Sequence, residues 1–499
     1  MFDKYRNLLN IMKKASIIGS GFSSLSAACY LASNGYEVNV YEKNAQLGGR
    51  ARQYEEQGFK FDMGPTWYWM PDVFDRFFSD LGRKTTDYYE LSKLGPAYRV
   101  YFGQDDFIDI DDSVDNILKT FESVEKGAAE KLKKFLKKAK SNYDIAIKNL
   151  VYKPGLNPLE LVTKDTIFEL KQFVLTISDY VKRNFKDTRL RQLLEFPVLF
   201  LGAKPSDTPL FYSFMNYADF GLGTWYAKGG MKSVVDGFVE VANELGVNFH
   251  LNANITSLNI DSNSAIESFE LNGEVVPAKL VISGADYKHT ESLLPAASRS
   301  YSDSYWDKKV IAPSSLLFYV GFSKKLKNVL HHTLFFDGSF DEHAVEIYDD
   351  AAWPKNPLFY ASFSSKTDNS VAPEGMEAAT FLIPLAPDLE DTEAMREKYF
   401  FIILDRLERL TKQKLKDDIL FKKSYCVQDF KDDYNSYKGN AYGLANTLRQ
   451  TAFLRPKIKS KKVKGLYFTG QLTVPGPGVP PAIISGKLVT DLVLKGNGG

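Results

Sequence analysis

The chain has 499 residues, with 63 Lys and Arg against 62 Asp and Glu, and its net charge of +1 argues against a nucleic-acid partner. This length is enough for two or three domains around a large core. The two cysteines, Cys29 and Cys426, form no disulfide framework, and the five histidines, with one close pair at 331–332, show no metal-site spacing. No apolar run reaches the roughly 20 residues of a membrane-spanning helix.

Residues 1–12 mix charged and apolar side chains and lack the long apolar core of a secretory signal. We expect either a short disordered leader over these residues or a natural start at Met12. A chain with so few cysteines suits a reducing compartment, which predicts a cytoplasmic location.

A nucleotide-binding pattern follows this segment. Residues 15–18 are predicted to form a buried parallel strand, and Gly19 and Gly21 let the next turn approach a diphosphate at the N-terminus of a helix. A second strand over 38–41 ends at Glu42, where a carboxylate accepts hydrogen bonds from an adenosine ribose. This order of strand, glycine turn, helix, strand and acid predicts a bound adenine dinucleotide.

A second glycine pair indicates which dinucleotide binds. Gly48-Gly49-Arg50 follows the acidic strand end, at a place where a nicotinamide enzyme needs no such group. The larger FAD lies extended, so a further loop must contact its diphosphate; glycines remove side-chain bulk and a guanidinium supplies charge and fixed donors. The tight loop over 61–66 is expected near the flavin.

The region from about 105 to 200 is charged and has helical patterning. Within it, KLKKFLKKAK over 131–140 places apolar residues on one face and lysines around the rest. Two interpretations stay open: this helix lies on an anionic membrane surface, or its apolar stripe packs on the protein.

Aromatic residues make up 14% of the chain and are dense over 210–226. This stretch forms either the wall of a tunnel for a long apolar substrate or ordinary core. Asp219 within it is a candidate proton acceptor, with a surface or capping aspartate as the alternative.

The later parts of the chain alternate between two kinds of pattern. Residues 222–300 have cofactor-domain character, including a strand over 280–282, whereas 301–435 has the strands and helix expected of a substrate domain. The C-terminus returns to the cofactor with a strand over 466–470 and a helix from Ala482 that follows two prolines. The N-terminus of this helix is expected to face the pyrimidine side of the flavin.

Five segments together resemble bacterial phytoene desaturases, a family of amine-oxidase-like FAD proteins. The segments are SIIGSGFSSLSAACYLASNGYEVNVYEKNAQLGGRAR from Ser16, GPTWYWMPDVF from Gly64, AKGGM from Ala227, VISGADY from Val281 and GLYFTGQLTVPGPGVPPAIISGK from Gly465. The resemblance spans nearly the whole chain and is weakest over 105–190. Ser24 departs from the commoner glycine or alanine, which affects packing detail.

The resemblance implies an α/β protein with a Rossmann-like FAD-binding domain built from discontinuous segments, and an α+β substrate domain with a helical, membrane-facing part. The expected FAD-binding segments are 13–85, 222–300 and 436–499, and the expected substrate-binding segments are 86–221 and 301–435.

The implied cofactor is non-covalent FAD. The residues expected to contact it are Gly19, Gly21, Glu42, Lys43, Gly49, Arg50, Gly64, Pro65, Thr66, Ile255, Asp286, Gly470, Pro481, Ala482 and Ile483.

The implied activity is stepwise insertion of double bonds into phytoene towards lycopene, by hydride transfer to flavin and loss of a proton. The substrate's own conjugation stabilises the cation, so no catalytic residue is assigned. The implied partners are an apolar polyene, a membrane surface bound peripherally, and oxygen or a quinone as electron acceptor. A hydroxycarotenoid desaturase, a carotenoid isomerase or saturase, an amine oxidase and a non-catalytic flavin-binding chaperone remain as alternatives.

Overall fold

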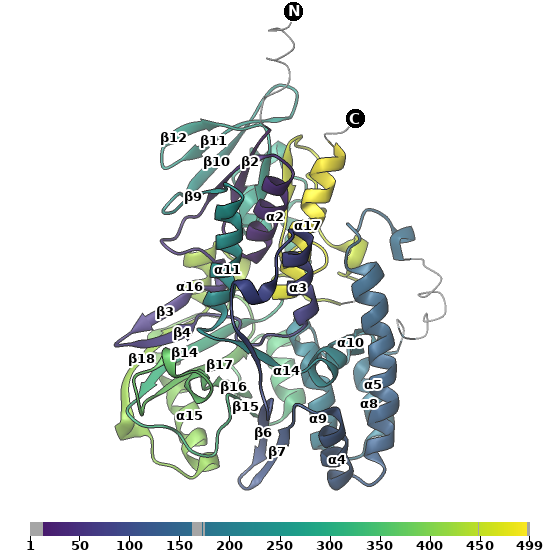
Figure 1. Cartoon of the computed structure of the whole chain (residues 1–499), viewed down its shortest axis with the longest axis vertical. Helices are drawn as coiled ribbons and strands as arrows, with labels where there is room; N and C mark the ends of the chain where they lie inside the picture. Colours follow the sequence, from purple (N-terminus) through teal and green to yellow (C-terminus); the bar gives the residue numbers. More distant parts are fainter. Residues whose placement is uncertain (1–12, 162–171, 173–174, 448, 497–499) are drawn as a thin grey trace, which may run out of the picture.

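Two large sheets and a cluster of helices organise the chain (Figure 1). The structure is a computed structural model that describes residues 13–161, 172, 175–447 and 449–496. One sheet lies near both chain ends, the second lies at the opposite end of the long axis, and the helices lie beside the second sheet (Figure 1).

The first sheet is entirely parallel and draws its strands from distant parts of the chain. In order across the sheet the strands are β19 (Leu466–Phe468), β13 (Val281–Ser283), β1 (Lys14–Ile18), β2 (Glu37–Tyr41) and β9 (Asn248–His250). A parallel sheet buried on both faces needs apolar strands, and this composition is present in all the central strands. The fold is therefore the predicted Rossmann-like one, built from discontinuous segments.

Helices α2 (Phe22–Ser33), α11 (Met231–Glu244) and α17 (Val479–Gly496) pack beside this sheet (Figure 1). The contact between α2 and α17 is close enough to require glycine. A Cβ atom added at Gly486 would lie 2.5 Å from the Ser23 carbonyl oxygen and 2.6 Å from the Ser26 Cβ. Helix α17 begins three residues before the predicted Ala482, because prolines are tolerated in a first turn whose N–H groups have no helical partner.

Three smaller sheets extend this part of the chain. Strands β10 (Ile255–Ile260), β11 (Ile266–Leu271) and β12 (Glu274–Pro277) form an antiparallel sheet. Strands β3 (Gln53–Glu56) and β4 (Phe59–Asp62) form a hairpin, and β5 (Leu91–Lys93) pairs with β8 (Trp225–Ala227).

The second large sheet is mostly antiparallel. Its strands, in order, are β18 (Ile419–Tyr425), β14 (Ser314–Phe322), β17 (Glu377–Leu385), β16 (Phe359–Ser362), β15 (His332–Phe335), β6 (Tyr98–Gly103) and β7 (Asp106–Ile110). Only the β15–β6 pair is parallel. Every residue of β14 is buried, which agrees with its central position and its continuous apolar sequence.

Helix α15 (Glu393–Thr411) covers one face of this sheet through a core of its own. The remaining helices are α3 (Pro71–Asp80), α4 (Val114–Val124), α5 (Ala128–Ile145), α8 (Ile177–Asn184), α9 (Thr188–Glu195), α10 (Phe214–Asn216), α12 (Tyr287–Ser292), α13 (Asp303–Asp307), α14 (Phe340–Tyr348) and α16 (Val427–Tyr434).

The lysine-rich segment 131–140 lies in α5, and its apolar stripe faces the protein. Leu132, Phe135, Leu136 and Ala139 are all buried. Of the two interpretations of this helix, packing on the protein is therefore the correct one for the apolar face. Among the described residues, no helix has the length and apolar character needed to cross a bilayer.

Candidate functional site

One cavity of about 720 Å³ runs from the carboxyl edge of the parallel sheet to the helical cluster. At one end it is lined by the glycine turn after β1 and by Glu42 at the end of β2. At the other end it is lined by apolar side chains from residues 146–151 and 199–215 and from the second sheet. Carboxyl edges of parallel strands are where such folds bind nucleotides.

The glycine turn provides a backbone cradle at the first end. Gly19 has a φ of +84°, which favours glycine, and Gly21 caps α2 without a side chain. A Cβ atom added at Gly49 would lie 3.1 Å from the Gly21 Cα, so the two glycine loops approach closely. Ser24 is fully buried against Gly284, where a Cβ would lie 2.1 Å from the serine hydroxyl. The small side chain at position 24 therefore keeps the packing tight.

Glu42 is buried, with 4% of its surface exposed, and it lies on the cavity wall. One carboxylate oxygen accepts hydrogen bonds from the Ser20 backbone N–H at 2.9 Å and the Ser20 hydroxyl at 2.7 Å. The other accepts from the backbone N–H and the side-chain amide of Asn44, both at 2.9 Å. Glu42 thus holds the glycine turn in place, a structural role that the sequence pattern did not indicate.

Arg50 has an incompletely satisfied guanidinium. One terminal nitrogen donates to the Ser436 hydroxyl at 3.2 Å and to the Asn440 carbonyl at 3.1 Å. Its Nε is buried and has no hydrogen-bond partner among the described residues, and burial lowers the pKa of the group. A buried donor without an acceptor is costly, and a diphosphate is an anion that would satisfy it. The residues present therefore fit a dinucleotide diphosphate.

Asp286 lies on the cavity wall at the start of α12. Its carboxylate accepts from the His289 backbone N–H at 3.2 Å and from the Tyr437 backbone N–H at 3.1 Å, and burial raises its pKa. His289 also lines the cavity, and burial lowers its pKa to about 4, so the imidazole is neutral. No motif pointed to His289, because its place depends on how α12 packs.

The remaining predicted residues divide into two groups. Besides the residues already described, the first group lines the cavity and consists of Lys43, Gly64, Pro65, Thr66, Ile255, Gly470, Pro481 and Ala482. Ile483 does not line it; its side chain is buried in the core, and its carbonyl accepts from the Ser26 hydroxyl at 2.8 Å. The next residue, Ile484, lines the cavity instead, since successive helical side chains point about 100° apart.

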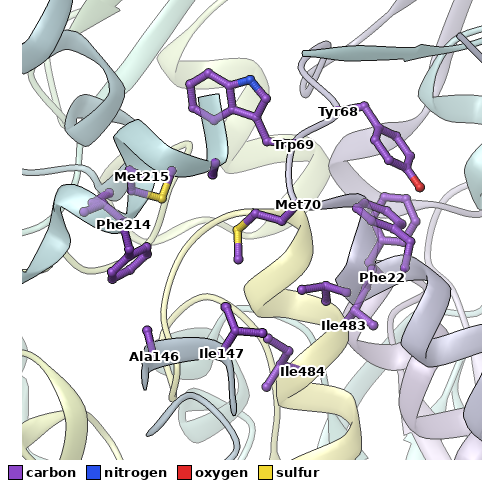
Figure 2. Packing of buried hydrophobic residues seen from close by; sticks show 14 of the residues in the cluster. Phe22, Tyr68, Trp69, Met70, Ala146, Ile147, Phe214, Met215, Ile483 and Ile484 are labelled. Carbon is purple, nitrogen blue, oxygen red and sulfur yellow. The ribbon is translucent and has the colours of Figure 1, made fainter. Parts of the chain in front are cut away.

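Apolar side chains from separate parts of the chain meet at the other end of the cavity. Figure 2 shows Ile147, Phe214, Met215 and Ile484 around Met70, and all five line the cavity. The aromatic stretch 210–226 is therefore divided between its two interpretations. Phe211 and Tyr212 line the cavity with Phe214, whereas Phe220 and Tyr226 belong to the packed interior.

Asp219 lies away from the cavity, in a π-helical turn over Tyr217–Gly221. It is 2% exposed, so it is neither a surface nor a proton-accepting residue of the site. The Tyr98 hydroxyl donates to it at 2.7 Å and the Thr224 hydroxyl at 3.4 Å. Burial raises its pKa to about 8.

We expect Glu42→Ala to lower FAD occupancy at least several-fold, because the variant loses the ribose acceptor and frees the Ser20 turn. Occupancy is measured as the flavin absorbance of purified protein per chain. Glu37→Ala is the matched control, since Glu37 begins the strand that Glu42 follows, pairs with Lys14 at 3.1 Å and does not line the cavity. Wild-type occupancy in Glu42→Ala would refute the assignment.

The raised pKa of Asp219 predicts a pH-dependent stability. An unfolded aspartate ionises near pH 4, whereas this carboxyl holds its proton up to about pH 8, so the folded state binds the extra proton in between. Stability should therefore fall as pH rises from 4 to 8. Asp219→Asn should match the wild-type melting temperature at pH 5 and exceed it at pH 8.5, while the exposed Asp405→Asn should follow wild type at both. If the melting temperature of Asp219→Asn fell between pH 5 and pH 8.5 by as much as that of the wild type, the assignment would be contradicted.

A family model described as flavin containing amine oxidoreductase matches residues 22–494. Over 484 residues the chain is 40% identical to a carotenoid 3,4-desaturase of Haloarcula japonica, covering 96% of this chain and 98% of that protein. It is 30% identical over 495 residues to a 4,4'-diapophytoene desaturase (4,4'-diaponeurosporene-forming) of Staphylococcus haemolyticus, with the same coverage of 96% and 98%.

Solved structures share the fold at lower identity. An oxidoreductase from Methanosarcina mazei superposes with a TM-score of 0.64 at 18% identity, covering 96% of this chain and all of the other. A variant of putrescine oxidase gives a TM-score of 0.62 at 14% identity, covering 97% of this chain and 99% of the other. The dinucleotide cradle, the family match and the full-length relatives agree. The chain therefore belongs to the flavin-containing amine oxidoreductases, as an FAD-dependent enzyme related to the carotenoid desaturases.

Proposed function

We propose that the chain is an FAD-dependent desaturase of carotenoids that inserts double bonds into phytoene stepwise towards lycopene. The single observation that carries this proposal is the continuous cavity, which joins a dinucleotide cradle to a long apolar chamber. A polyene chain needs such an apolar channel, and its reacting bond must meet the cofactor at the junction of the two ends.

The protein's own part in this reaction is to hold and orient the cofactor and the polyene and to exclude water. We assign FAD binding to segments 13–85, 222–300 and 436–499, with Arg50 towards the diphosphate and Glu42 towards the ribose. Segments 86–221 and 301–435 hold the polyene between aromatic and aliphatic walls. Bound FAD supplies the acceptor for the hydride removed from the substrate. The apolar wall of the cavity keeps water away from the carbon cation that remains on the substrate.

A second candidate reaction is 3,4-desaturation of a carotenoid. It is favoured by the relative of that name, which is 40% identical over nearly the whole chain, whereas the diapophytoene desaturase is 30% identical. Both reactions use the same cavity and cofactor, and they differ in which carbon–carbon bond lies beside the flavin.

An amine oxidase is less well supported. Such an enzyme needs polar or charged groups near the flavin for a cationic amine. Among the described residues, two lysines line the cavity. Lys43 lies at the dinucleotide end, and Lys153 is exposed at the far end. Most side chains that line the space between them are apolar, and Thr66 and Tyr360 are among the polar ones.

We further propose that the protein binds a membrane peripherally, on the cytoplasmic side, and that oxygen or a quinone reoxidises the flavin. The proposed contact surface lies at the far end of the cavity, where the lining residues Lys153 and Asn157 are exposed. Leu156 is 53% exposed, Leu159 76% and Leu454 41%. Exposed leucines at a cavity mouth would let an apolar substrate enter from lipid without crossing water.

Reconstitution tests the function directly. The purified protein with FAD, added to liposomes loaded with phytoene, should generate visible absorption bands with polyene fine structure. Chromatography then identifies the product, and parallel assays with carotenoids that lack a 3,4 double bond distinguish the second candidate. Turnover of amines with unchanged carotenoid spectra would overturn the proposal.

The membrane surface predicts a specific loss of binding. Leu156→Asn combined with Leu159→Asn should reduce co-sedimentation with anionic liposomes several-fold, because two apolar contacts with the bilayer are lost. Val275→Asn is the matched control, because Val275 is 66% exposed on β12, away from the cavity. Reversal of the exposed lysine charges on α5 tests the earlier interpretation of that helix. Unchanged binding of the leucine variant would refute the proposed surface.

A further inference from the structure

A series of side-chain hydrogen bonds leads from the cavity wall into the second sheet. It begins at Thr66, in the loop after β4, and passes through Tyr360 on β16 to His332 at the start of β15. Strands β15 and β16 are adjacent, with His332 opposite Ser362, so Tyr360 is a diagonal neighbour of His332. Thr66 and Tyr360 line the cavity, whereas His332 lies behind them with no exposed surface.

The distances along this series are those of strong hydrogen bonds. The Thr66 hydroxyl lies 2.8 Å from the Tyr360 hydroxyl, which lies 2.6 Å from the Nδ1 of His332. Trp67 stacks on the imidazole with centroids 4.0 Å apart and planes 10° apart. The ring of His332 is therefore held in one orientation, with Nδ1 towards Tyr360.

His332 presents a neutral nitrogen at Nδ1, which burial makes a weak base that only a strong acid such as a carbon cation would protonate. Burial lowers the pKa of the imidazole well below its usual value, so the ring is neutral and carries one donor and one acceptor nitrogen. With Nδ1 as the acceptor, Tyr360 donates to it and Thr66 donates to Tyr360. The lone pair of the Thr66 oxygen then remains towards the cavity.

Building on the proposed function, we propose that Thr66, Tyr360 and His332 form a proton relay that removes the proton released in each desaturation. Bound FAD would accept the hydride, with its two electrons, from the substrate, and a carbon cation would remain. A C–H bond on the adjacent carbon then breaks, and its electron pair forms the new double bond. Its proton binds the Thr66 oxygen, the threonine proton moves to Tyr360, and the tyrosine proton moves to Nδ1 of His332. Both hydroxyl groups are regenerated neutral, and His332 becomes an imidazolium.

A second buried histidine lies beside the end of this relay. His331 lies beside His332, with ring centroids 4.5 Å apart, and its Nδ1 hydrogen-bonds the Thr367 hydroxyl at 2.8 Å. Thr367 is exposed, so His331 is hydrogen-bonded to a residue at the surface, and His332 contacts His331 through its ring. The Nε2 atoms of both histidines are buried without a hydrogen-bond partner in the described part of the chain. Buried polar atoms of this kind are costly in a purely structural pair.

The test is single-turnover reduction of the flavin by a carotenoid in the FAD-loaded protein. Slow proton loss lets the hydride return to the cation, so Tyr360→Phe and Thr66→Val should slow net reduction on the order of 10²-fold. Thr66→Ser, which keeps a hydroxyl, should restore most of the rate lost in Thr66→Val. The wild-type rate should fall in D₂O, and this solvent isotope effect should disappear in Tyr360→Phe.

Tyr101→Phe is the matched control. Tyr101 lies on β6 of the same sheet and donates to the Asn328 carbonyl at 2.6 Å, and it does not line the cavity. Flavin content and melting temperature separate loss of the relay from loss of the fold. If Tyr360→Phe loses flavin, His332→Gln, which keeps hydrogen-bonding groups but is not a base, should give the same slow reduction.

Three outcomes are decisive. Wild-type rates and an unchanged isotope effect in Tyr360→Phe would overturn the relay while leaving the desaturase function intact. Slow reduction in Thr66→Val that Thr66→Ser does not restore would also overturn it, since the hydroxyl would then be irrelevant. Failure of any carotenoid to reduce the wild-type flavin would overturn the proposed function, and the relay with it.

Discussion

The pairing of β13 with β1 on one side and β19 on the other is the interaction on which the site depends. Ile282 lies opposite Ile17 in one strand and opposite Tyr467 in the other, so three distant segments share one register. Each strand is followed by a glycine on the cavity wall, at positions 19, 284 and 470. Because parallel strands end at one edge, this pairing brings the three glycine turns together. Without it, no single segment forms a cofactor cradle.

The cavity combines a charged end with an apolar end. At the dinucleotide end, Asp286 is buried and Arg50 is half-buried, and their opposite charges partly offset the cost of removing them from water. At the other end, apolar walls leave few polar groups. The series of hydrogen bonds from Thr66 to His332 lies beside that apolar wall, where each polar atom needs a partner. The Thr66 hydroxyl and its hydrogen-bonded partners are therefore among the few polar groups beside the apolar wall.

Family membership and geometry answer different questions about this protein. The family match and the relatives identify an FAD-dependent oxidoreductase related to the carotenoid desaturases. The distant solved structures share the fold alone, and they include a putrescine oxidase. The cavity of this chain has an apolar half beside its dinucleotide end. Side chains of residues 146–151 and 199–215 form much of that half, and the first of these segments lies in the region where the sequence resemblance is weakest.

Local sequence determined the turns and strand ends from which the cofactor end of this protein is built. The turn at Gly19 and Gly21, the acid at Glu42 and the prolines before α17 are short-range signals, since backbone conformation and strand ends follow from neighbouring residues. The parallel sheet and the nature of the cofactor could therefore be predicted. The boundaries of the elements shifted by only a few residues, as at Val479.

Tertiary structure decided the rest, because the direction of a side chain depends on what packs against its element. It placed Ile484 rather than Ile483 on the cavity wall and turned the apolar face of α5 inward. It buried Asp219 away from the cavity, and it joined Thr66, Tyr360 and His332 across nearly 300 residues of sequence. No periodicity within one segment encodes such contacts, since their partners lie on other elements.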